Sequence, residues 1–112
     1  MNTNIKNLPA GEYFTRCSYS DKSAFLVLKR TAKSATVAQI EVDSDPEWKE
    51  KMQITAGGFG GHCDNQHEQT WLFREVSGAP VVIRQHKDGQ WRCKNGQRFV
   101  ADTAREFYDY NF

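Results

Sequence analysis

Turn-forming residues interrupt this chain so often that no apolar pattern of helical period runs beyond about two turns. Between the turns lie short runs rich in β-branched and aromatic residues, the side chains that strands favour. These runs are 11–19, 24–30, 35–42, 70–76, 81–87, 90–94 and 97–101. The sequence therefore predicts a mostly β protein.

The length and the aromatic content of the chain predict one folded domain. A chain of 112 residues can bury a core but not a core together with a second domain. Seven Phe, four Tyr and three Trp residues supply the bulky apolar surface that disordered chains lack. Short strands without β-α-β spacing predict a small antiparallel barrel or a strongly bent sheet. We expect one β-rich domain over 1–112, with an SH3-like barrel as first choice, one or two short helical turns, and a flexible start at 1–9.

Two dipeptides that favour tight hairpins, Asp88-Gly89 and Asn95-Gly96, divide the region after residue 81. Both are typical of type I′ turns, in which the two central residues adopt positive φ angles. The last three strand runs are therefore predicted to form an antiparallel meander. A short polar connection at 31–34 predicts a further hairpin between the second and third runs.

The meander has a local positive charge. Between residues 84 and 98, five cationic side chains oppose the single carboxylate of Asp88, which gives a charge of +4. The five are Arg84, Lys87, Arg92, Lys94 and Arg98. Trp91 and Phe99 lie among them, and aromatic rings beside cations are typical of surfaces that bind single-stranded nucleic acid. The alternative is that both rings lie in the core while the cations face solvent on the other side of the strands.

A segment of opposite charge lies near the middle of the chain. Between residues 41 and 50, five carboxylates oppose one lysine, which gives a charge of −4. Its candidate binding residues are Asp43, Asp45, Glu47 and Glu50. A capping Ser44 or Asp45 before Pro46 predicts a short helix from 46 to about 52, anchored by Trp48. Such a face can dock on a nucleic-acid-binding protein in place of its nucleic acid, although a solvated helix face is the more common role.

Residues 56–61 hold four of the eight glycines and are predicted to form a loop or tight bend without regular structure. A run of polar and ionisable residues follows, from 62 to 69. The amides of Asn65, Gln66 and Gln69 are suited to bonding backbone groups of the loop and so fixing its geometry, and a fixed loop can act as a binding surface. The candidate binding residues of this loop are Phe59, His62, Asp64, Asn65, Gln66, His67 and Glu68.

Cys63 raises two chemical alternatives. His62 or His67 could activate its thiol as a nucleophile, with glycine N–H groups stabilising an oxyanion. The same three residues, together with Cys93 or His86, could hold a zinc ion. Neighbouring side chains on an extended chain point to opposite faces, however, and the spacing matches no common metal-binding pattern. We therefore assign no catalytic residue, metal ligand or cofactor.

Charge, cysteine content and hydropathy bear on location. No apolar run has the length of a signal peptide or of a membrane-spanning helix. Cys17, Cys63 and Cys93 are odd in number and far apart, which favours reduced thiols. A net charge of +1 excludes a surface built wholly around phosphate, so any nucleic-acid contact must be local. We expect a cytoplasmic protein without a membrane partner, and the oligomeric state stays open.

The chain ends in an aromatic tail. Tyr108, Tyr110 and Phe112 alternate with polar residues, and this alternation predicts a closing strand that buries one side of each ring. Residues 102–106, just before the tail, are predicted to form a single helical turn.

The segment from Gly57 to Trp71 and the tail from Phe107 to Phe112 resemble uncharacterised small proteins of phages and mobile elements. The resemblance implies a cytoplasmic accessory protein that acts during infection, and it brings no catalytic residues. It also implies a partner, since such proteins often bind a host factor of the nucleic-acid machinery or of an antiviral defence system.

Three functions remain as alternatives. A non-enzymatic protein that binds and inhibits or modulates a host protein, through the loop at 57–69 or the acidic segment, ranks first. A nucleic-acid-binding barrel that uses the basic meander ranks second. An enzyme or metal site around residues 62–67 ranks third.

Overall fold

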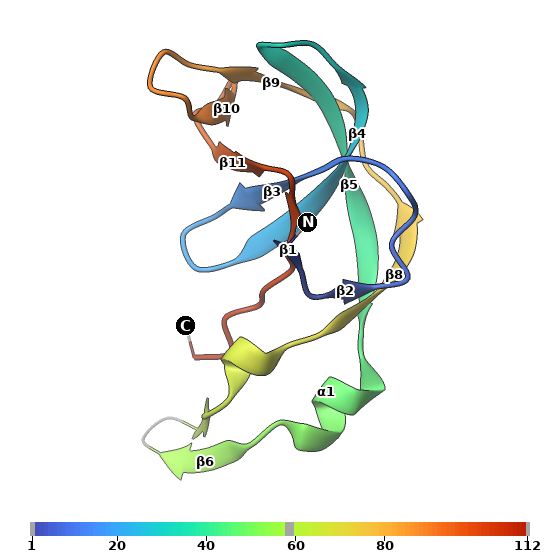
Figure 1. Ribbon diagram of the computed structural model, residues 1–112. Helices are drawn as coiled ribbons and strands as arrows, with labels where there is room; N and C mark the ends of the chain where they lie inside the picture. The colour runs from blue at the N-terminus through green and yellow to red at the C-terminus, as the bar shows by residue number, and fades with distance from the viewer. Residues whose placement is uncertain (1, 58–59, 112) are drawn as a thin grey trace.

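The computed structural model describes residues 2–57 and 60–111, and the fold is mostly β, as predicted. Its strands are β1 (Asn2–Thr3), β2 (Ile5–Lys6), β3 (Tyr13–Cys17), β4 (Lys22–Arg30), β5 (Ser34–Ser44), β6 (Ile54–Gly57), β7 (Gly60–Cys63), β8 (Trp71–Val76), β9 (Val81–Gln85), β10 (Trp91–Cys93), β11 (Arg98–Ala101) and β12 (Thr103–Ala104). The helical elements are α1 (Pro46–Lys51) and the short 3-10 helix η1 (Gln66–Glu68) (Figure 1). Every predicted strand run is present, with ends that differ by a few residues.

Six antiparallel strands close into a barrel, which confirms the predicted small barrel. Their order is β5-β4-β3-β11-β10-β9, and β9 pairs back with β5. Apolar side chains fill the interior, where Phe14 meets Trp91 edge to face with ring centroids 5.0 Å apart. The buried residues of this core are Phe14, Phe25, Ala35, Val37, Ile83, Trp91 and Phe99.

A second, smaller core covers the outer face of β3 and β4. Strand β5 extends beyond the barrel and pairs with β8, which pairs in parallel with β2 (Figure 1). The buried residues of the second core are Ile5, Tyr13, Ala24, Ile40 and Ala104. The structure therefore corrects the expected flexible start for residues 2–6: β1 pairs with β12, β2 pairs with β8, and Ile5 is only 5% exposed. Burial of Ile5 supplies the apolar contact that holds this segment.

Both hairpins of the basic meander are present, but their turns differ from the predicted type. A type I′ turn needs positive φ at both central residues. Gly89 and Gly96 have φ angles of 84° and 89°, whereas Asp88 and Asn95 are not among the described residues with positive φ. The N–H of each glycine bonds the carbonyl three residues earlier, at His86 and Cys93. This pattern fits a longer hairpin loop with a left-handed glycine at its end.

Helix α1 forms as predicted. The Asp45 carboxylate accepts a hydrogen bond from the Glu47 N–H at 3.1 Å, and Pro46 occupies the first helical position. Trp48 is fully buried and lies against Tyr110, with ring centroids 6.1 Å apart. The buried indole therefore anchors a helix that is too short to be stable alone.

The glycine-rich segment is more regular than predicted. Residues 56–57 and 60–61 belong to the hairpin β6–β7, in which Ala56 lies opposite Gly61. A side chain at position 61 would collide with Cγ2 of Ile54, so glycine lets the two strands approach. The expectation of no regular structure is therefore wrong for these positions, while 58–59 lie outside the described residues.

The tail also differs from the prediction. Residues 103–104 form β12 instead of a helical turn, and Asp102 before them has a φ of 59°. After β12 only Phe107 makes a strand-like bridge, to Lys22. Tyr108 and Tyr110 are therefore not on a closing strand, and Phe112 lies outside the described residues. Among the described helices, none has the length and apolar content needed to cross a membrane.

Candidate functional site

The three amide side chains of the polar loop bond backbone groups, but these groups do not belong to the loop as expected. Asn65 accepts from the Gln53 N–H at 2.8 Å and donates to the Lys51 carbonyl at 2.7 Å. Gln66 accepts from the N–H of Tyr110 at 2.9 Å, and Gln69 is only 2% exposed. Their partners lie beyond the loop itself, at the end of α1 and in the C-terminal tail. These side chains are therefore committed to the fold and are poor candidates for binding a partner.

Side chains from distant parts of the chain hold the backbone of the tail. Asn4 accepts from the N–H of Glu106 at 3.0 Å and donates to its carbonyl at 2.8 Å. Three further N–H groups of the tail also donate to side chains. The N–H groups of residues 105, 108 and 109 donate to Thr15, Gln69 and Asp21, respectively. The tail is thus bound like an extended peptide, in which Phe107 pairs with the backbone of Lys22 and the residues around it bond to side chains.

The remaining loop candidates stay closer to solvent. The Thr55 hydroxyl donates to the Asp64 carboxylate, and His62 Nε2 lies 3.9 Å from the other oxygen of that carboxylate. His67 and Glu68, on η1, are exposed. Phe59, the other loop candidate, lies outside the described residues.

Cys63 faces the fold interior and not the histidines. Its side chain is 2% exposed, and its Sγ lies 3.9 Å from Oδ1 of Asn65. The side chain of Asn111 bonds both the N–H and the carbonyl of Cys63. His62, next to it on β7, is exposed. Within residues 2–57 and 60–111, no group of three or more His, Cys, Asp or Glu side chains could hold a metal ion.

The acidic segment is largely neutralised by ion pairs. Lys6 Nζ lies 2.7 Å from Asp45 and 2.9 Å from Glu47. The side-chain hydrogen bond from Lys6 lowers the pKa of Asp45 to about 2, and Thr70 adds to this effect. Arg74 lies 3.6 Å from Asp43. Of the predicted acidic candidates, Glu50 alone among the described residues makes no ion pair or side-chain hydrogen bond.

The basic meander brings its arginines into one row across three strands. Arg92 on β10 lies opposite Arg84 on β9 and opposite Arg98 on β11. Residues directly opposite each other share a face of the sheet, and here that face is the outside of the barrel. We call Arg84, Arg92 and Arg98 the arginine row. Trp91 and Phe99 are 5% and 3% exposed and lie in the core, which is the second of the two alternatives for these rings, so they are not available to stack on bases.

Most cations of the meander have no partner among the residues that the structure describes. Arg92 lies 2.9 Å from Asp88, and this contact holds the pKa of Asp88 below its usual range. No hydrogen bond or ion pair joins the other four side chains to any residue that the structure describes. These four are Arg84, Lys87, Lys94 and Arg98. Arg92, the central member of the row, is therefore compensated by Asp88, whereas Arg84 and Arg98 on either side of it have no anionic partner among the described residues.

Two adjoining open recesses lie beside the arginine row. One has a volume of about 460 Å³ and is bordered by Arg84, Arg92 and Lys94. The other has a volume of about 650 Å³ and is bordered by Pro80, Val81 and Lys94. Val82, which is 51% exposed, lies in both. An apolar floor next to cations suits a ligand with a flat ring and a phosphate.

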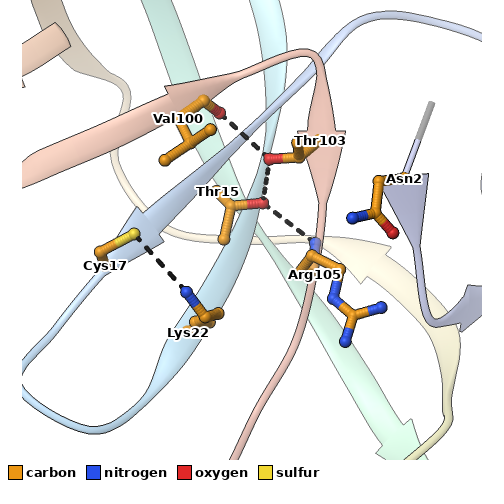
Figure 2. Close-up of a pocket in the computed structure, with 7 residues that line it drawn as sticks. All are labelled: Asn2, Thr15, Cys17, Lys22, Val100, Thr103 and Arg105. Atoms are coloured by element: carbon orange, nitrogen blue, oxygen red, sulfur yellow. Dashed lines mark hydrogen bonds between the residues drawn. The ribbon is translucent and has the colours of Figure 1, made fainter. Parts of the chain in front are cut away.

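Sequence reasoning missed a third recess, between the outer face of the barrel and the terminal strands. Figure 2 shows its lining, which includes Lys22 on β4 and Arg105 after β12. The register of β3 and β4 places Lys22 opposite Cys17, which itself lies opposite Arg98 of the arginine row. The hairpin pattern of β3 and β4 could have revealed Lys22. No local pattern connects Arg105 with it.

Comparisons with models of protein families, with curated proteins and with solved structures found no match to this chain. The SH3-like arrangement and the resemblance to phage proteins therefore stay predictions.

Proposed function

We propose that this protein binds single-stranded nucleic acid on the outer face of β9, β10 and β11. The observation that carries the proposal is the arginine row, a set of like charges aligned by strand register. A fold without a polyanionic partner gains nothing from this alignment, because cross-strand like charges lower stability. The loop and the acidic segment are mostly occupied by internal contacts, so the basic meander is the candidate site with the most uncommitted side chains.

The dimensions of the row suit a phosphate backbone. Neighbouring strands are about 4.8 Å apart, so Arg84 and Arg98 stand roughly 10 Å apart at their backbones. A strand that follows the row places successive phosphates near successive guanidinium groups, which donate hydrogen bonds to phosphate oxygens in a bidentate manner. Bases then reach the apolar floor around Val82. The small net charge of the chain fits a local contact of this kind.

An exposed aromatic residue lies near the far end of the row. Tyr19 is 94% exposed in the turn between β3 and β4, two residues after Cys17. Its ring offers a stacking surface for a base, in place of the two buried rings of the meander.

Cys17, Cys63 and Cys93 are all free thiols in the structure, and we place the function in the cytoplasm.

Salt dependence of affinity tests the proposal. We would measure binding of a fluorescent oligothymidylate by anisotropy at several salt concentrations, for the wild type and for Arg84→Gln and Arg98→Gln. Affinity should fall steeply with salt, and each variant should reduce the slope by about 0.7 because one fewer counterion is released. Lys29→Gln, on the exposed part of β4, is the matched control and should leave the slope unchanged. No binding, or a slope that the arginines do not affect, would contradict the proposal.

A second candidate function, binding to a host protein, is favoured by the hairpin β6–β7. This hairpin lies at the opposite end of the molecule from β9 and β10 (Figure 1). Ile54 is 58% exposed there, and the His62 side chain is 63% exposed. An exposed apolar side chain beside a polar one is a typical feature of protein contact surfaces.

The two ends of the molecule allow these functions to be separated. We would use the tagged protein to capture partners from bacterial lysate after nuclease treatment, and compare Ile54→Ser with Arg98→Gln. A stoichiometric protein lost with Ile54→Ser and retained with Arg98→Gln would support host-protein binding by the hairpin. Loss with the arginine variant alone would assign the partner to the meander instead.

A further inference from the structure

The recess beside the terminal strands is a separate concave site on the same outer face. It has a volume of about 330 Å³. Its lining residues come from β1, β3, β4, β11, β12 and the start of the tail, as Figure 2 shows. They are Asn2, Thr15, Cys17, Lys22, Val100, Thr103 and Arg105. These segments are far apart in the sequence, and the fold brings them together.

The charge of the recess is positive. Lys22 and Arg105 are its two ionisable cations, and no carboxylate is among its lining residues. Within the described residues, the side chains of Arg105 and Asn2 make no hydrogen bond or ion pair. The one contact of the Lys22 ammonium is with Cys17 Sγ at 4.0 Å, which is a weak interaction. The recess therefore offers two cations and one amide to a ligand.

The centre of the recess is neutral and fixed. The Thr15 hydroxyl accepts hydrogen bonds from the Thr103 hydroxyl at 2.7 Å and from the Arg105 N–H at 3.0 Å. Figure 2 shows both hydrogen bonds to Thr15. This bond from Arg105 fixes the backbone from which the Arg105 side chain extends, which reduces part of the ordering cost of binding an anion.

Strand register joins this recess to the arginine row. Arg98, the last arginine of the row, lies opposite Cys17, which lies opposite Lys22. A nucleic-acid strand that follows the row toward β4 therefore reaches the recess. A terminal phosphate monoester carries about 1.5 to 2 negative charges near pH 7, more than a phosphodiester within the strand, and it fits two cations better.

We propose that this recess binds a terminal phosphate of the nucleic-acid strand, with Lys22 and Arg105 as the phosphate ligands. The inference rests on the proposed function, which it extends from an open row to a site that recognises a strand end. Asn2 supplies a further donor to the phosphate oxygens. The recess recognises the phosphate monoester group of the strand end, and inorganic phosphate presents the same chemistry to it.

The test compares strands that differ only at their ends. We would measure affinities for internally labelled oligothymidylates of one length with a 5′ phosphate, a 3′ phosphate or two hydroxyl ends. One of the phosphorylated strands should bind about 10-fold more tightly than the hydroxyl strand, which corresponds to about 1.4 kcal/mol. Lys22→Gln and Arg105→Gln should remove this preference and retain binding of the hydroxyl strand. Arg98→Gln should weaken binding of all three strands alike, and Lys29→Gln is the matched control.

The outcomes separate this inference from the proposed function. Equal affinities for the three strands, or a preference that survives both recess variants, would overturn the terminal-phosphate site and leave the arginine row intact. If no strand binds, the proposed function fails, and NMR titration with inorganic phosphate tests the recess alone. Amide shifts at Lys22 and Arg105 that chloride does not reproduce at equal ionic strength would support the recess, and their absence would overturn it.

Discussion

The side-chain amide of Gln69 forms two hydrogen bonds with the backbone of Tyr108, in the way that two residues of neighbouring strands bond each other. The Tyr108 N–H donates to Oε1 at 3.0 Å, and Nε2 donates to the Tyr108 carbonyl at 2.6 Å. Gln69 is buried, so both amide groups have lost water as a partner. The aromatic tail is thus fixed by single side chains, and each of them can be removed by one substitution.

Gln69→Ala should lower the free energy of unfolding by about 1–3 kcal/mol, because it leaves the N–H and carbonyl of Tyr108 without partners. Urea unfolding followed by tryptophan fluorescence measures the effect. The matched control is Gln97→Ala, whose side chain makes no hydrogen bond to a described residue and whose loss should change stability by less than about 0.5 kcal/mol. Equal effects of the two substitutions would contradict the role of Gln69.

Glu106 should make the protein less stable as pH rises. Burial raises the pKa of its carboxyl from 4.5 to about 7, and a backbone hydrogen bond with Ala24 and the charge of Arg16 only partly offset this. The folded state therefore holds a proton that the unfolded state releases, and stability declines between about pH 4.5 and 7. Glu106→Gln should flatten this decline in unfolding experiments across that range. Glu50→Gln, an exposed carboxylate on α1, should leave the decline in place.

Asp45 should have the opposite pH dependence. Its pKa is lowered to about 2 by Lys6 first and by Thr70 next, so its stabilising effect is present above pH 4 and is lost as pH falls toward 2. Asp45→Asn keeps a helix-capping side chain but removes the charge facing Lys6. The variant should be less stable than the wild type at pH 6, and the difference should shrink as pH falls below 4. Asp43→Asn, which removes an exposed charge, serves as control, and a difference that is constant with pH would refute the prediction.

Removing one cation from the arginine row should stabilise the fold. Arg98→Thr replaces a like charge opposite Arg92 by a residue that strands favour, and the free energy of unfolding should rise by about 0.2–1 kcal/mol at low salt. The gain should decrease as salt screens the repulsion. Lys29→Thr is the control, since Lys29 lies opposite Thr36 and not opposite a cation. If Arg98→Thr is destabilising at low salt, the row is not under electrostatic strain.

The three thiols should differ in reactivity. Cys63 is buried, whereas Cys17 and Cys93 are partly exposed. A thiol reagent added to the folded protein should modify Cys17 and Cys93 and reach Cys63 only after unfolding, as mass spectrometry of the peptides would show. Rapid modification of Cys63 in the folded state would favour the nucleophile alternative raised by the sequence. Cys63→Ala would then have to abolish an activity while preserving the fold.

Local sequence patterns correctly predicted those elements whose formation depends on residues adjacent in the sequence. The capping Asp45 followed by Pro46 marks the start of α1, because both residues act on the adjacent backbone. Gly89 and Gly96 mark the two hairpins of the meander for the same reason, although the turn type depends on loop length and was predicted wrongly.

The tail and the recess depend on contacts between distant residues. The alternation of Tyr108 and Tyr110 is typical of a strand, but the groups that bond this backbone are side chains such as Asn4 and Gln69. Composition likewise indicated the basic meander, whereas the alignment of its arginines follows from register. Arg105 lies in the same recess as Lys22 only because the chain after β11 crosses the outer face of β3. No periodicity in the sequence predicts that course of the chain.

The pairing that closes the barrel also limits when it can form during synthesis. Arg98 on β11 lies opposite Cys17 on β3, so strands from the two ends of the chain must meet. A nascent chain that has emerged only as far as β5 pairs β3 with β4 and leaves the other edge of β3 open. Sheets dominated by such distant pairings fold slowly, and an open strand edge promotes aggregation in the meantime. The barrel is therefore expected to close only after β11 has emerged from the ribosome, and rapid synthesis at high temperature should favour inclusion bodies.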